Sequence, residues 1–406
     1  MKSRGYKKSE IVLITIRGPD GPGITAKLTG ILAQAKSVRL LDIEQTVVHR
    51  KLLLSVLVAF DKNGAGQAPV MKDLLFAAKQ LGVNLEFEVF DSKLFATGGP
   101  DHQYVVTCLG SEVGAYPLSC IAKALAARGV NIDKIGKLTA HSLSCIELLV
   151  HAARALDPKR LTQELLGLAT ELDVDIAVQS ADLQRRAKRL IALDMDSTLI
   201  QTEVIDELGR LAGVERKMQA ITKSALQGRR HFGEALRERV KLLRTLPVSA
   251  LERVCRKIRL TPGAQRLIRV LKHLGYRTAL ISGGFTYFTD KLRQRLGFDY
   301  AFANILEIVN EKLTGQLIGD IVDGHRKGLI LETIAQGEGI ELDQTVAVGD
   351  GANDLPMLSK AGLGIAFHAH ERVRKQTAHG LSKGHGLDSI LYLLGISERE
   401  LARLKI

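Results

Sequence analysis

Two aspartates one residue apart, Asp194 and Asp196, follow an apolar run at 190–193 and precede two hydroxyl side chains. Such a run is typical of a buried parallel strand. In an open α/β sheet, ligands bind beyond the carboxyl ends of the strands, so these carboxylates would lie where chemistry is expected. Two close carboxylates are costly to ionise together unless a cation neutralises them. The pair therefore predicts a site for a divalent metal with oxygen ligands, most simply Mg²⁺.

Polar groups of complementary type follow two later apolar runs. One run ends in Ser282-Gly-Gly, which offers a hydroxyl and a bare backbone that an anion can approach closely. The other is followed by Asp350, Asn353 and Asp354. Each motif alone is typical of an ordinary turn. Because three strand ends agree, we interpret them as one catalytic edge of a sheet.

The elements that must position these groups form a Rossmann-like doubly wound parallel sheet. Apolar strands at 278–281, 345–348 and 363–367 alternate with helical segments. Helical periodicity without a strand signal fills about 203–262, which predicts a helical cap over the site. Residues 305–318 read as a hairpin with its turn at 310–312.

The first half of the chain contains an internal repeat, offset by the distance from Gly18 to Gly110. Both copies show the βαββαβ order of a ferredoxin-like module. The expected domains are therefore 1–95, 96–184 and 185–406. The strands expected in the first copy are 11–17, 39–49, 51–60 and 84–90, and those in the second are 104–109, 131–138, 143–151 and 174–179. The first copy is expected to have one helix that ends at about 36 and one at 69–81. The second is expected to have one helix that ends at 128 and one at 159–171.

Composition describes a globular protein of 406 residues, with 46% hydrophobic and 25% charged residues. The N-terminus lacks the apolar core of a signal peptide, no run is long enough to span a membrane, and the four cysteines show no metal-ligand spacing, so we expect a cytoplasmic protein. The net charge is +13, most of it after position 184. This field could steer an anionic substrate or attract nucleic acid. Few aromatic residues and no Trp argue against nucleic acid.

The catalytic half resembles the haloacid dehalogenase-like phosphatases, and its cap resembles that of the phosphoserine phosphatases. The repeats resemble ACT domains, small regulatory modules that often bind amino acids. The residues that carry the resemblance are Asp194-Met-Asp196-Ser-Thr, Ser282-Gly283-Gly284, Lys327, Gly349-Asp350-Gly-Ala-Asn353-Asp354, Glu203, and the cap segments 222–232 and 236–240.

The resemblance implies a covalent mechanism on two carboxylates. Asp194 would attack phosphorus to form an aspartyl-phosphate. Asp196 would serve as general acid and then as general base. Asp194, the backbone carbonyl of Asp196, and Asp350 would bind Mg²⁺.

The resemblance also implies the substrate contacts. Ser282, the Gly283 N–H and Lys327 would hold the phosphoryl oxygens, with Asn353 at the phosphate or the nucleophile. Asp354 would not bind the metal directly but would orient the residues that do.

The amino-acid part of the substrate needs opposite charges at its two ends. Glu203 suits an ammonium group, Arg239 suits a carboxylate through its forked guanidinium, and Phe232 would close the lid. Without the resemblance, all three would be interpreted as ordinary cap residues.

The implied activity is hydrolysis of O-phospho-L-serine to L-serine, the last step of L-serine biosynthesis. A phosphatase for another small phosphorylated amine, a ligand sensor with a vestigial site, and a nucleic-acid-binding protein are the alternatives. We also expect a homodimer and L-serine as a possible effector of the ACT pair. The second repeat lacks the Asp-Gly-Pro-Gly of 20–23, which argues against an effector site built from both copies. The alternative interpretation of 20–23 is an N-capped helix start that binds no ligand.

Overall fold

The computed structural model divides the chain into two compact units, residues 1–99 and 100–406. The structure describes residues 9–35, 38–61, 67–90, 102–140, 144–152, 158–226, 231–377, 379–382 and 384–404. The expected boundary at 95/96 and residues 227–230 of the cap motif lie outside these ranges. Within them, none of the helices combines the length and the apolar character needed to cross a bilayer.

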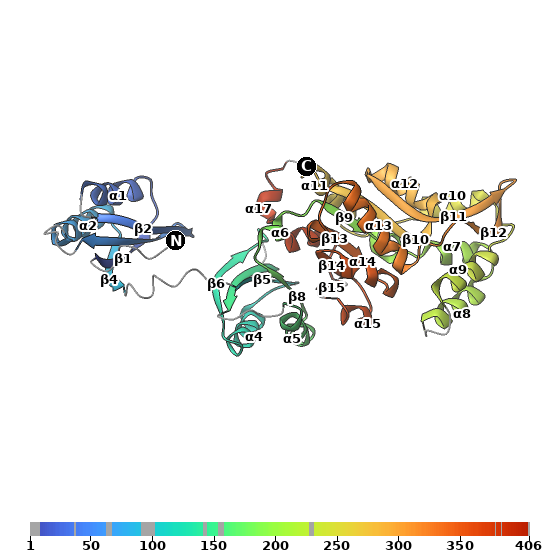
Figure 1. The fold of residues 1–406 in the computed structure, drawn as a ribbon, viewed down its shortest axis with the longest axis horizontal. Helices are drawn as coiled ribbons and strands as arrows, with labels where there is room; N and C mark the ends of the chain where they lie inside the picture. The colour runs from blue at the N-terminus through green and yellow to red at the C-terminus, as the bar shows by residue number, and fades with distance from the viewer. Residues whose placement is uncertain are drawn as a thin grey trace. The chain divides into compact units, whose positions relative to one another are not determined.

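The first unit is a four-stranded antiparallel sheet in the order β2-β3-β1-β4, with two helices (Figure 1). Side chains alternate across a strand, so Val12, Ile14 and Ile16 of the first strand all enter one apolar core. The βαββαβ order predicted from the sequence is confirmed. The elements are β1 (Ser9–Pro19), α1 (Ile24–Gln34), β2 (Val38–Val48), β3 (Lys51–Asp61), α2 (Gln67–Leu81) and β4 (Asn84–Phe90).

The helix α1 begins without a side-chain cap. Gly23 stands at its N-cap with φ 91°, a left-handed conformation that glycine adopts without steric cost. The Asp20 N–H is bonded to the carbonyl of Arg50, 2.9 Å away. Gly23 therefore has a conformational reason of its own, and the expected capping of this helix by a side chain of 20–23 is wrong.

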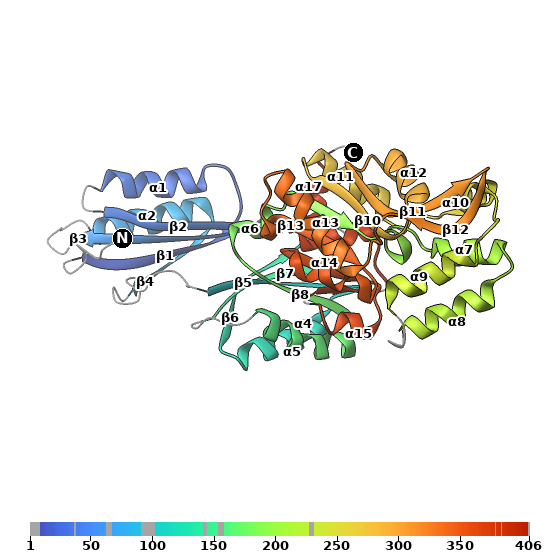
Figure 2. The ribbon, with the colours of Figure 1, turned by 45° about the vertical axis from the view of Figure 1, so that its right-hand side comes forward.

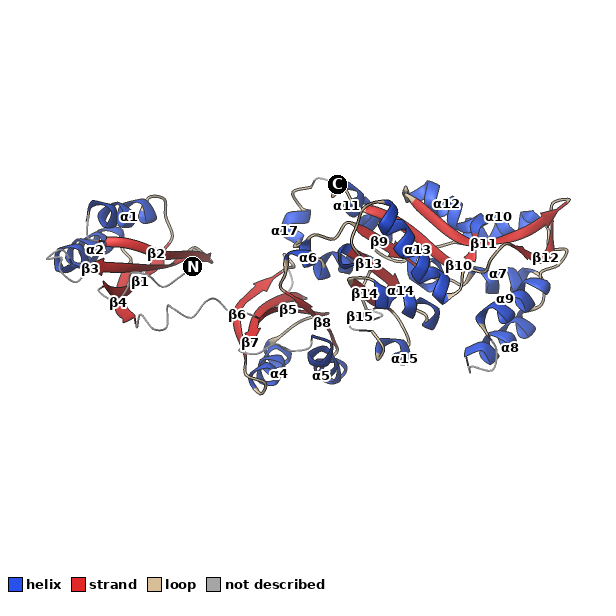
Figure 3. Ribbon diagram, in the orientation of Figure 1, coloured by secondary structure: helices blue, strands red, loops and turns tan. Residues whose placement is uncertain are grey.

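The second unit opens with the second copy of the same module, in the order β6-β7-β5-β8. Its two helices cover one face of the sheet (Figure 3). The elements are β5 (His102–Gly110), α4 (Ala115–Ala126), β6 (Val130–Lys137), β7 (Cys145–Ala152), α5 (Pro158–Glu171) and β8 (Val174–Ser180).

A seven-stranded sheet forms the rest of the second unit, in the order β12-β11-β10-β9-β13-β14-β15. Every neighbouring pair is parallel except β11 and β12, which form the predicted hairpin. The turn of that hairpin is Asn310-Glu311, both at positive φ, as a two-residue turn requires. The strands are β9 (Leu190–Leu193), β10 (Arg277–Phe285), β11 (Tyr300–Val309), β12 (Lys312–Ile318), β13 (Thr345–Gly349), β14 (Leu363–Phe367) and β15 (His379–Leu381).

Helices on both faces of this sheet account for its apolar strands. In β9, Ile191 and Leu193 enter one core while Leu190 and Ala192 enter another, and all four are fully buried. The predicted doubly wound architecture is confirmed. The helices are α6 (Leu183–Arg186), α11 (Ala264–His273), α12 (Thr286–Leu296), α13 (Gly324–Gly337), α14 (Leu355–Lys360), α15 (Glu371–Arg374), α16 (Ile390–Leu393) and α17 (Glu398–Leu401).

The insert after β9 is helical, as predicted, and its two ends meet where Leu260 forms an isolated antiparallel bridge to Ile200. The Thr245 N–H, just before the last cap helix, donates to the carbonyl of Leu313 at 2.8 Å and ties the cap to the hairpin. The cap helices are α7 (Val204–Leu211), α8 (Glu215–Leu226), α9 (Phe232–Lys241) and α10 (Val248–Lys257).

One face of the second βαββαβ module packs against the catalytic sheet. Leu109 and Ala177 of the module belong to the same apolar core as β9. Strand β8 lies beside β15 (Figure 1), and the Gln179 amide donates to the carbonyl of Leu393 at 2.9 Å. In Figure 2 the module's strands β5, β7 and β8 lie between its helices α4 and α5 and the catalytic domain. This module and the catalytic sheet therefore form a single unit, which the sequence analysis did not anticipate.

Candidate active site

The chain turns sharply at the end of β9. The Asp194 N–H still donates to the carbonyl of Val348, 2.9 Å away, so the strand is paired up to this residue. Ser197 then adopts φ 56°, in the left-handed region. This turn leaves the carboxylates of Asp194 and Asp196 at the same edge of the sheet, 5% and 9% exposed.

Lys327 joins two carboxylates of this edge. Its ammonium lies 2.7 Å from Asp194 Oδ1 and 2.7 Å from Asp354 Oδ1. Lys327 stands in the first turns of α13, whose start is capped by the side chain of Asp323. Lys327 and Asp354 have no solvent-exposed surface. Because a buried charge without a partner is strongly destabilising, removing any one of these three side chains would leave the others with unpaired charge.

Three carboxylates offer oxygens for a cation. Oxygens of Asp194, Asp350 and Asp354 all lie within 4.8 Å of one another. The Thr198 hydroxyl donates to Asp350 Oδ1 at 3.0 Å, and the Gly351 N–H donates to Asp354 Oδ2 at 3.0 Å. Clustered carboxylate oxygens suit a hard divalent cation. The carboxylate of Asp196 instead accepts the Val204 N–H at 3.0 Å.

Burial shapes the protonation of the cluster. Burial, reinforced by Asp354 and opposed by Lys327, raises the pKa of Asp194 to about 7. Burial and then the neighbouring Asp194 raise the pKa of Asp350 to about 8, and burial raises that of Asp196 well above its usual range. Burial would lower the pKa of Lys327, but Asp194 and Asp354 raise it. A bound cation would lower the pKa values of these carboxyl groups, because it stabilises their ionised forms.

The end of β10 places a glycine backbone, with no side chain in between, close to Asp196. The Gly284 N–H donates to Ser282 Oγ at 2.9 Å, which fixes the hydroxyl. A Cβ at Gly284 would stand 2.7 Å from Asp196 Oδ2. Only glycine therefore lets this strand approach the second carboxylate so closely.

Asn304 holds this segment from the next strand, a role that the sequence analysis missed. Its amide donates to the Gly283 carbonyl at 2.8 Å, while its Oδ1 accepts the Val322 N–H at 2.8 Å. Asn304 is 2% exposed. The polar residue within an otherwise apolar strand pattern was the available signal.

The cap meets the sheet at Phe232. A Cβ at Gly283 would stand 3.0 Å from Phe232 Cζ, so the ring lies directly against the glycine backbone. Phe232 is the first residue of α9 and is partly buried against the same core as β9. The cap thus covers the Ser282-Gly283 end of the site.

Between cap and sheet lie charges of both signs. The Ser197 hydroxyl donates to Glu203 Oε1 at 2.9 Å. Arg239 has a long contact of 3.5 Å to Thr222 Oγ1, and its buried Nε has no partner among the described residues. Burial lowers the pKa of Arg239 and raises that of Glu203. Glu203 and Arg239 can therefore still form hydrogen bonds with a ligand that carries one positive and one negative group.

The loop after β13 carries Asn353. A Cβ at Gly351 would stand 2.2 Å from Asn353 Oδ1, so this side chain lies over the loop that holds Asp350. A Cβ at Gly324 would stand 2.7 Å from the Asn353 carbonyl. The start of α13 therefore packs closely on this loop. The structure brings Asn353 to the same strand edge as the carboxylates.

Family models match three parts of the chain. Residues 191–359 match the haloacid dehalogenase-like hydrolases, and residues 10–88 and 102–179 each match an ACT domain. The chain is 41% identical over 391 residues to a phosphoserine phosphatase of Streptomyces coelicolor, covering 96% of this chain and 93% of the relative. It is 39% identical to one from Mycobacterium tuberculosis, covering 96% and 94%.

Solved structures show the same architecture. A haloacid dehalogenase family hydrolase of Salmonella enterica serovar Typhi aligns with a TM-score of 0.64 at 31% identity, covering 72% of this chain and 98% of that one. A probable phosphoserine phosphatase of Vibrio cholerae aligns with a TM-score of 0.58 at 34% identity, covering 78% and 94%.

Proposed function

This chain belongs to the phosphoserine phosphatases, and from that premise we propose that it hydrolyses O-phospho-L-serine to L-serine and phosphate as the last step of L-serine biosynthesis. The observation that carries the proposal is the buried group of Asp194, Lys327 and Asp354 beneath a cap that holds Glu203 and Arg239. The group suits phosphoryl transfer, and the two cap residues suit the two charged ends of an amino acid.

Asp194 is the nucleophile of this proposal. A carboxylate oxygen of Asp194 forms a bond to phosphorus, and the bond between phosphorus and the serine oxygen breaks. Water then attacks the phosphorus of the aspartyl-phosphate, which releases phosphate and restores the carboxylate. The Met195 N–H, 2.8 Å from Asp194 Oδ1, and Lys327 hold the side chain in one orientation before either step.

Asp196 carries the proton. Burial raises the pKa of Asp196 well above its usual range, which favours the protonated carboxyl that would pass its proton to the serine oxygen as the ester bond breaks. The resulting carboxylate takes a proton from the attacking water in the second step. The Val204 N–H, 3.0 Å away, fixes the carboxyl group at the base of the cap.

The acidic cluster fits a magnesium ion, with Asp194, the Asp196 backbone carbonyl and Asp350 as ligands. Bound there, Mg²⁺ would supply positive charge that reduces repulsion between the nucleophile and the phosphate. Asp354 holds Lys327 beside the cluster. The Thr198 hydroxyl orients Asp350.

The phosphoryl oxygens need donors that are already in place. Ser282 Oγ, the Gly283 N–H and the Lys327 ammonium are proposed to hold them, with the Asn353 amide beside the nucleophile. Asn304 supports this set by bonding the Gly283 carbonyl, which orients the peptide.

Selection of the serine moiety is assigned to the cap. The Arg239 fork would bind the substrate carboxylate, and Glu203 would bind the ammonium. Phe232 would exclude water from above Gly283. The buried, unpartnered Nε of Arg239 supports this assignment, because an unsatisfied donor gains from an incoming acceptor.

The N-terminal part is proposed to be regulatory. Residues 1–95 and 96–184 would form two ACT modules and residues 185–406 the phosphatase, with L-serine as a possible effector and a homodimer as the assembly. Loss of L-serine inhibition after deletion of residues 1–90 would assign an effector role to the first module, and inhibition that persists would exclude that role.

The test is phosphate release from a panel of phosphorylated amines in the presence of Mg²⁺. O-phospho-L-serine should be hydrolysed with a higher kcat/KM than O-phosphohomoserine and O-phosphoethanolamine. A preference for either of these would favour a related phosphatase of other specificity. Absence of turnover on all three would contradict the proposal.

A further inference from the structure

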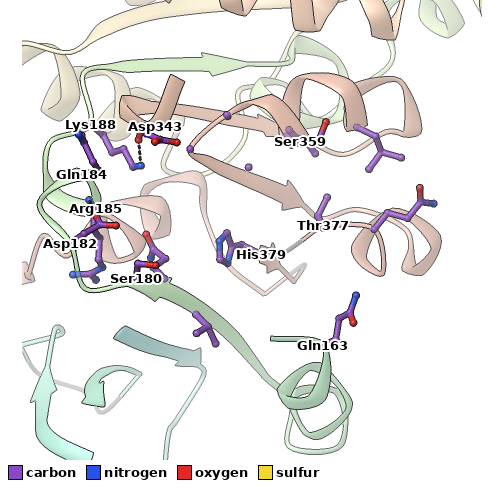
Figure 4. A pocket seen from close by; sticks show the side chains of 18 of the residues that line it. Gln163, Ser180, Asp182, Gln184, Arg185, Lys188, Asp343, Ser359, Thr377 and His379 are labelled. Carbon is purple, nitrogen blue, oxygen red and sulfur yellow. Dashed lines mark hydrogen bonds between the residues drawn. The ribbon is translucent and has the colours of Figure 1, made fainter. Parts of the chain in front are cut away.

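A cavity of about 650 Å³ lies between the second ACT module and the catalytic sheet (Figure 4). Lys188, Asp343 and His379 line it, and each stands at or just before the amino end of a parallel strand: β9, β13 and β15. The reactive carboxylates occupy the opposite, carboxyl edge. Asp194 is six residues after Lys188 in the chain, roughly 20 Å if extended. The amino-edge part of the cavity that Lys188 and His379 line therefore lies away from the nucleophile, although Leu355, which follows Asp354, lines the cavity as well.

Two residues that line this cavity carry a buried side-chain nitrogen without a hydrogen-bond partner in the described part of the chain. His379 Nδ1 and Arg185 Nε have no hydrogen-bond partner among the described residues, although the two side chains are only 7% and 6% exposed. In Figure 4, the ring of His379 projects from β15 toward the side on which Ser180 and Lys188 lie. Unsatisfied buried polar atoms are rare in native proteins, since each costs free energy.

Lys188 adds a cation with donors to spare. The residue is 7% exposed, and its ammonium reaches the backbone carbonyl of Asp343. Burial lowers its pKa, although Asp182 and Asp343 act in the opposite direction. An ammonium carries three donors, and a neutral carbonyl leaves its charge without a full counter-ion.

The remaining groups define what could enter. Burial and the charge of Lys188 lower the pKa of His379 to about 4, so the ring is neutral at pH 7. The outer guanidinium of Arg185 is paired with Glu147. None of the lining residues is Phe, Tyr or Trp, so no ring offers to stack on a base. Asp182 and Asp343 also line the cavity, and the Asp182 side chain already accepts the Arg185 N–H at 3.0 Å. The Arg185 Nε and the protons of Lys188 that do not reach the Asp343 carbonyl are donors without an acceptor within the described ranges, so an incoming molecule must bring acceptors.

We propose that this cavity is a second binding site, which takes a small oxyanion, carboxylate or phosphate, between Lys188, Arg185 and His379. The anion gives Lys188 its counter-ion and satisfies the unpartnered nitrogens. Arg185 and Lys188 lie in the segment that leads from the ACT module to β9, and His379 lies in β15, so the bound anion joins this segment to the edge of the catalytic sheet. Binding here does not depend on the active-site metal or on turnover.

Calorimetric titration in EDTA removes the active-site metal, and the Lys188 variant then distinguishes binding in this cavity from binding of the same anion beside Arg239 or Lys327. Inorganic phosphate and acetate are titrated separately, and their relative affinities distinguish the two sources of oxyanion. The variant Lys188→Met should weaken binding about tenfold or more, the loss expected when a charge-assisted hydrogen bond is removed. Lys375→Met, at an exposed lysine that lines the same cavity and pairs with Glu371, should change binding less than twofold.

A second variant guards against misfolding. His379→Phe should also weaken binding, and the melting temperature and phosphatase activity of each variant report whether it is folded. If Lys188→Met does not fold, the wild-type titration and a crystal soaked in tungstate remain decisive: anomalous density beside Lys188 is expected. Two results would overturn the proposal: the wild type binds neither phosphate nor acetate in EDTA, or folded Lys188→Met binds them as tightly as the wild type.

Discussion

The ammonium of Lys327 lies 2.7 Å from Asp194 Oδ1 in a place that solvent does not reach. The same nitrogen is 2.7 Å from Asp354 Oδ1. One buried cation thus fixes the position of the proposed nucleophile and ties β9, α13 and the loop after β13 together. Stability and reactivity share this contact.

Removing the cation should therefore damage both properties. Lys327→Met leaves buried carboxylates without their counter-charge, which costs on the order of 3–5 kcal/mol of unfolding free energy. Phosphatase activity should fall at least about 10²-fold, because a transition-state donor is lost. Urea unfolding and steady-state kinetics measure the two effects. The matched control is Lys360→Met, which removes a partly exposed pair with Glu332 and should cost no more than about 1 kcal/mol.

The acidic cluster predicts an unusual pH dependence of the metal-free protein. Burial raises the pKa of Asp194 to about 7 and of Asp350 to about 8, against 3.8 ordinarily. Between about pH 4 and pH 8 the native state then binds more protons than the unfolded state, so stability falls as pH rises, by at most about 1.4 kcal/mol per pH unit for each carboxyl.

Thermal unfolding in EDTA at pH 5 and pH 8 measures this effect. Asp350→Asn should reduce the loss of stability between the two pH values, and Mg²⁺ should stabilise the wild type more at pH 8 than at pH 5. A pH dependence that is unchanged in Asp350→Asn would contradict the assignment.

Gly284 should tolerate no side chain. In Gly284→Ala the new Cβ would stand 2.7 Å from Asp196 Oδ2 and 2.8 Å from Met195 Cε, so the acid must move. A displacement of this kind should lower kcat by roughly 10–100-fold. Gly337→Ala, at the open end of α13 where nothing lies within 4 Å, is the control and should leave kcat unchanged. Equal kcat values for the two variants would show that this close approach is not needed.

Arg239 should matter only for substrates with a carboxylate. Arg239→Lys keeps the charge but loses the fork, so kcat/KM for O-phospho-L-serine should fall about 10–100-fold. For O-phosphoethanolamine, which lacks the carboxylate, the change should be small. Arg237→Lys, on an exposed face of the same helix, serves as control. A parallel loss on both substrates would indicate a structural role instead.

Much of the architecture follows from local patterns in the sequence. The buried run at 190–193 predicts β9, and parallel strands place Asp194, Ser282 and Asp350 at one edge. Contacts between residues that are distant in the sequence could not be predicted in the same way. The amide of Asn304 satisfies the backbone of a neighbouring strand, and nothing in its local sequence specifies that partner.

The docking of the second ACT module was missed, although a comparison of the repeats contains the signal. Leu109, in the core shared with the catalytic sheet, stands where the first module has Arg17, and Ala177 stands where it has Glu86. Arg17 and Glu86 pair with each other while 59% and 66% exposed. The repeats have the same fold, but at these two positions the second is apolar where the first is charged, which favours burial of this part of its sheet.

The most direct test of the central claim is to trap the phosphorylated enzyme. Acid quenching during turnover of phosphate-labelled O-phospho-L-serine should leave label on the peptide that contains Asp194, and hydroxylamine should release it, as expected for an acyl phosphate. Asp194→Asn should carry no label and show no turnover. Label on another residue, or turnover at the wild-type rate in Asp194→Asn, would contradict the mechanism.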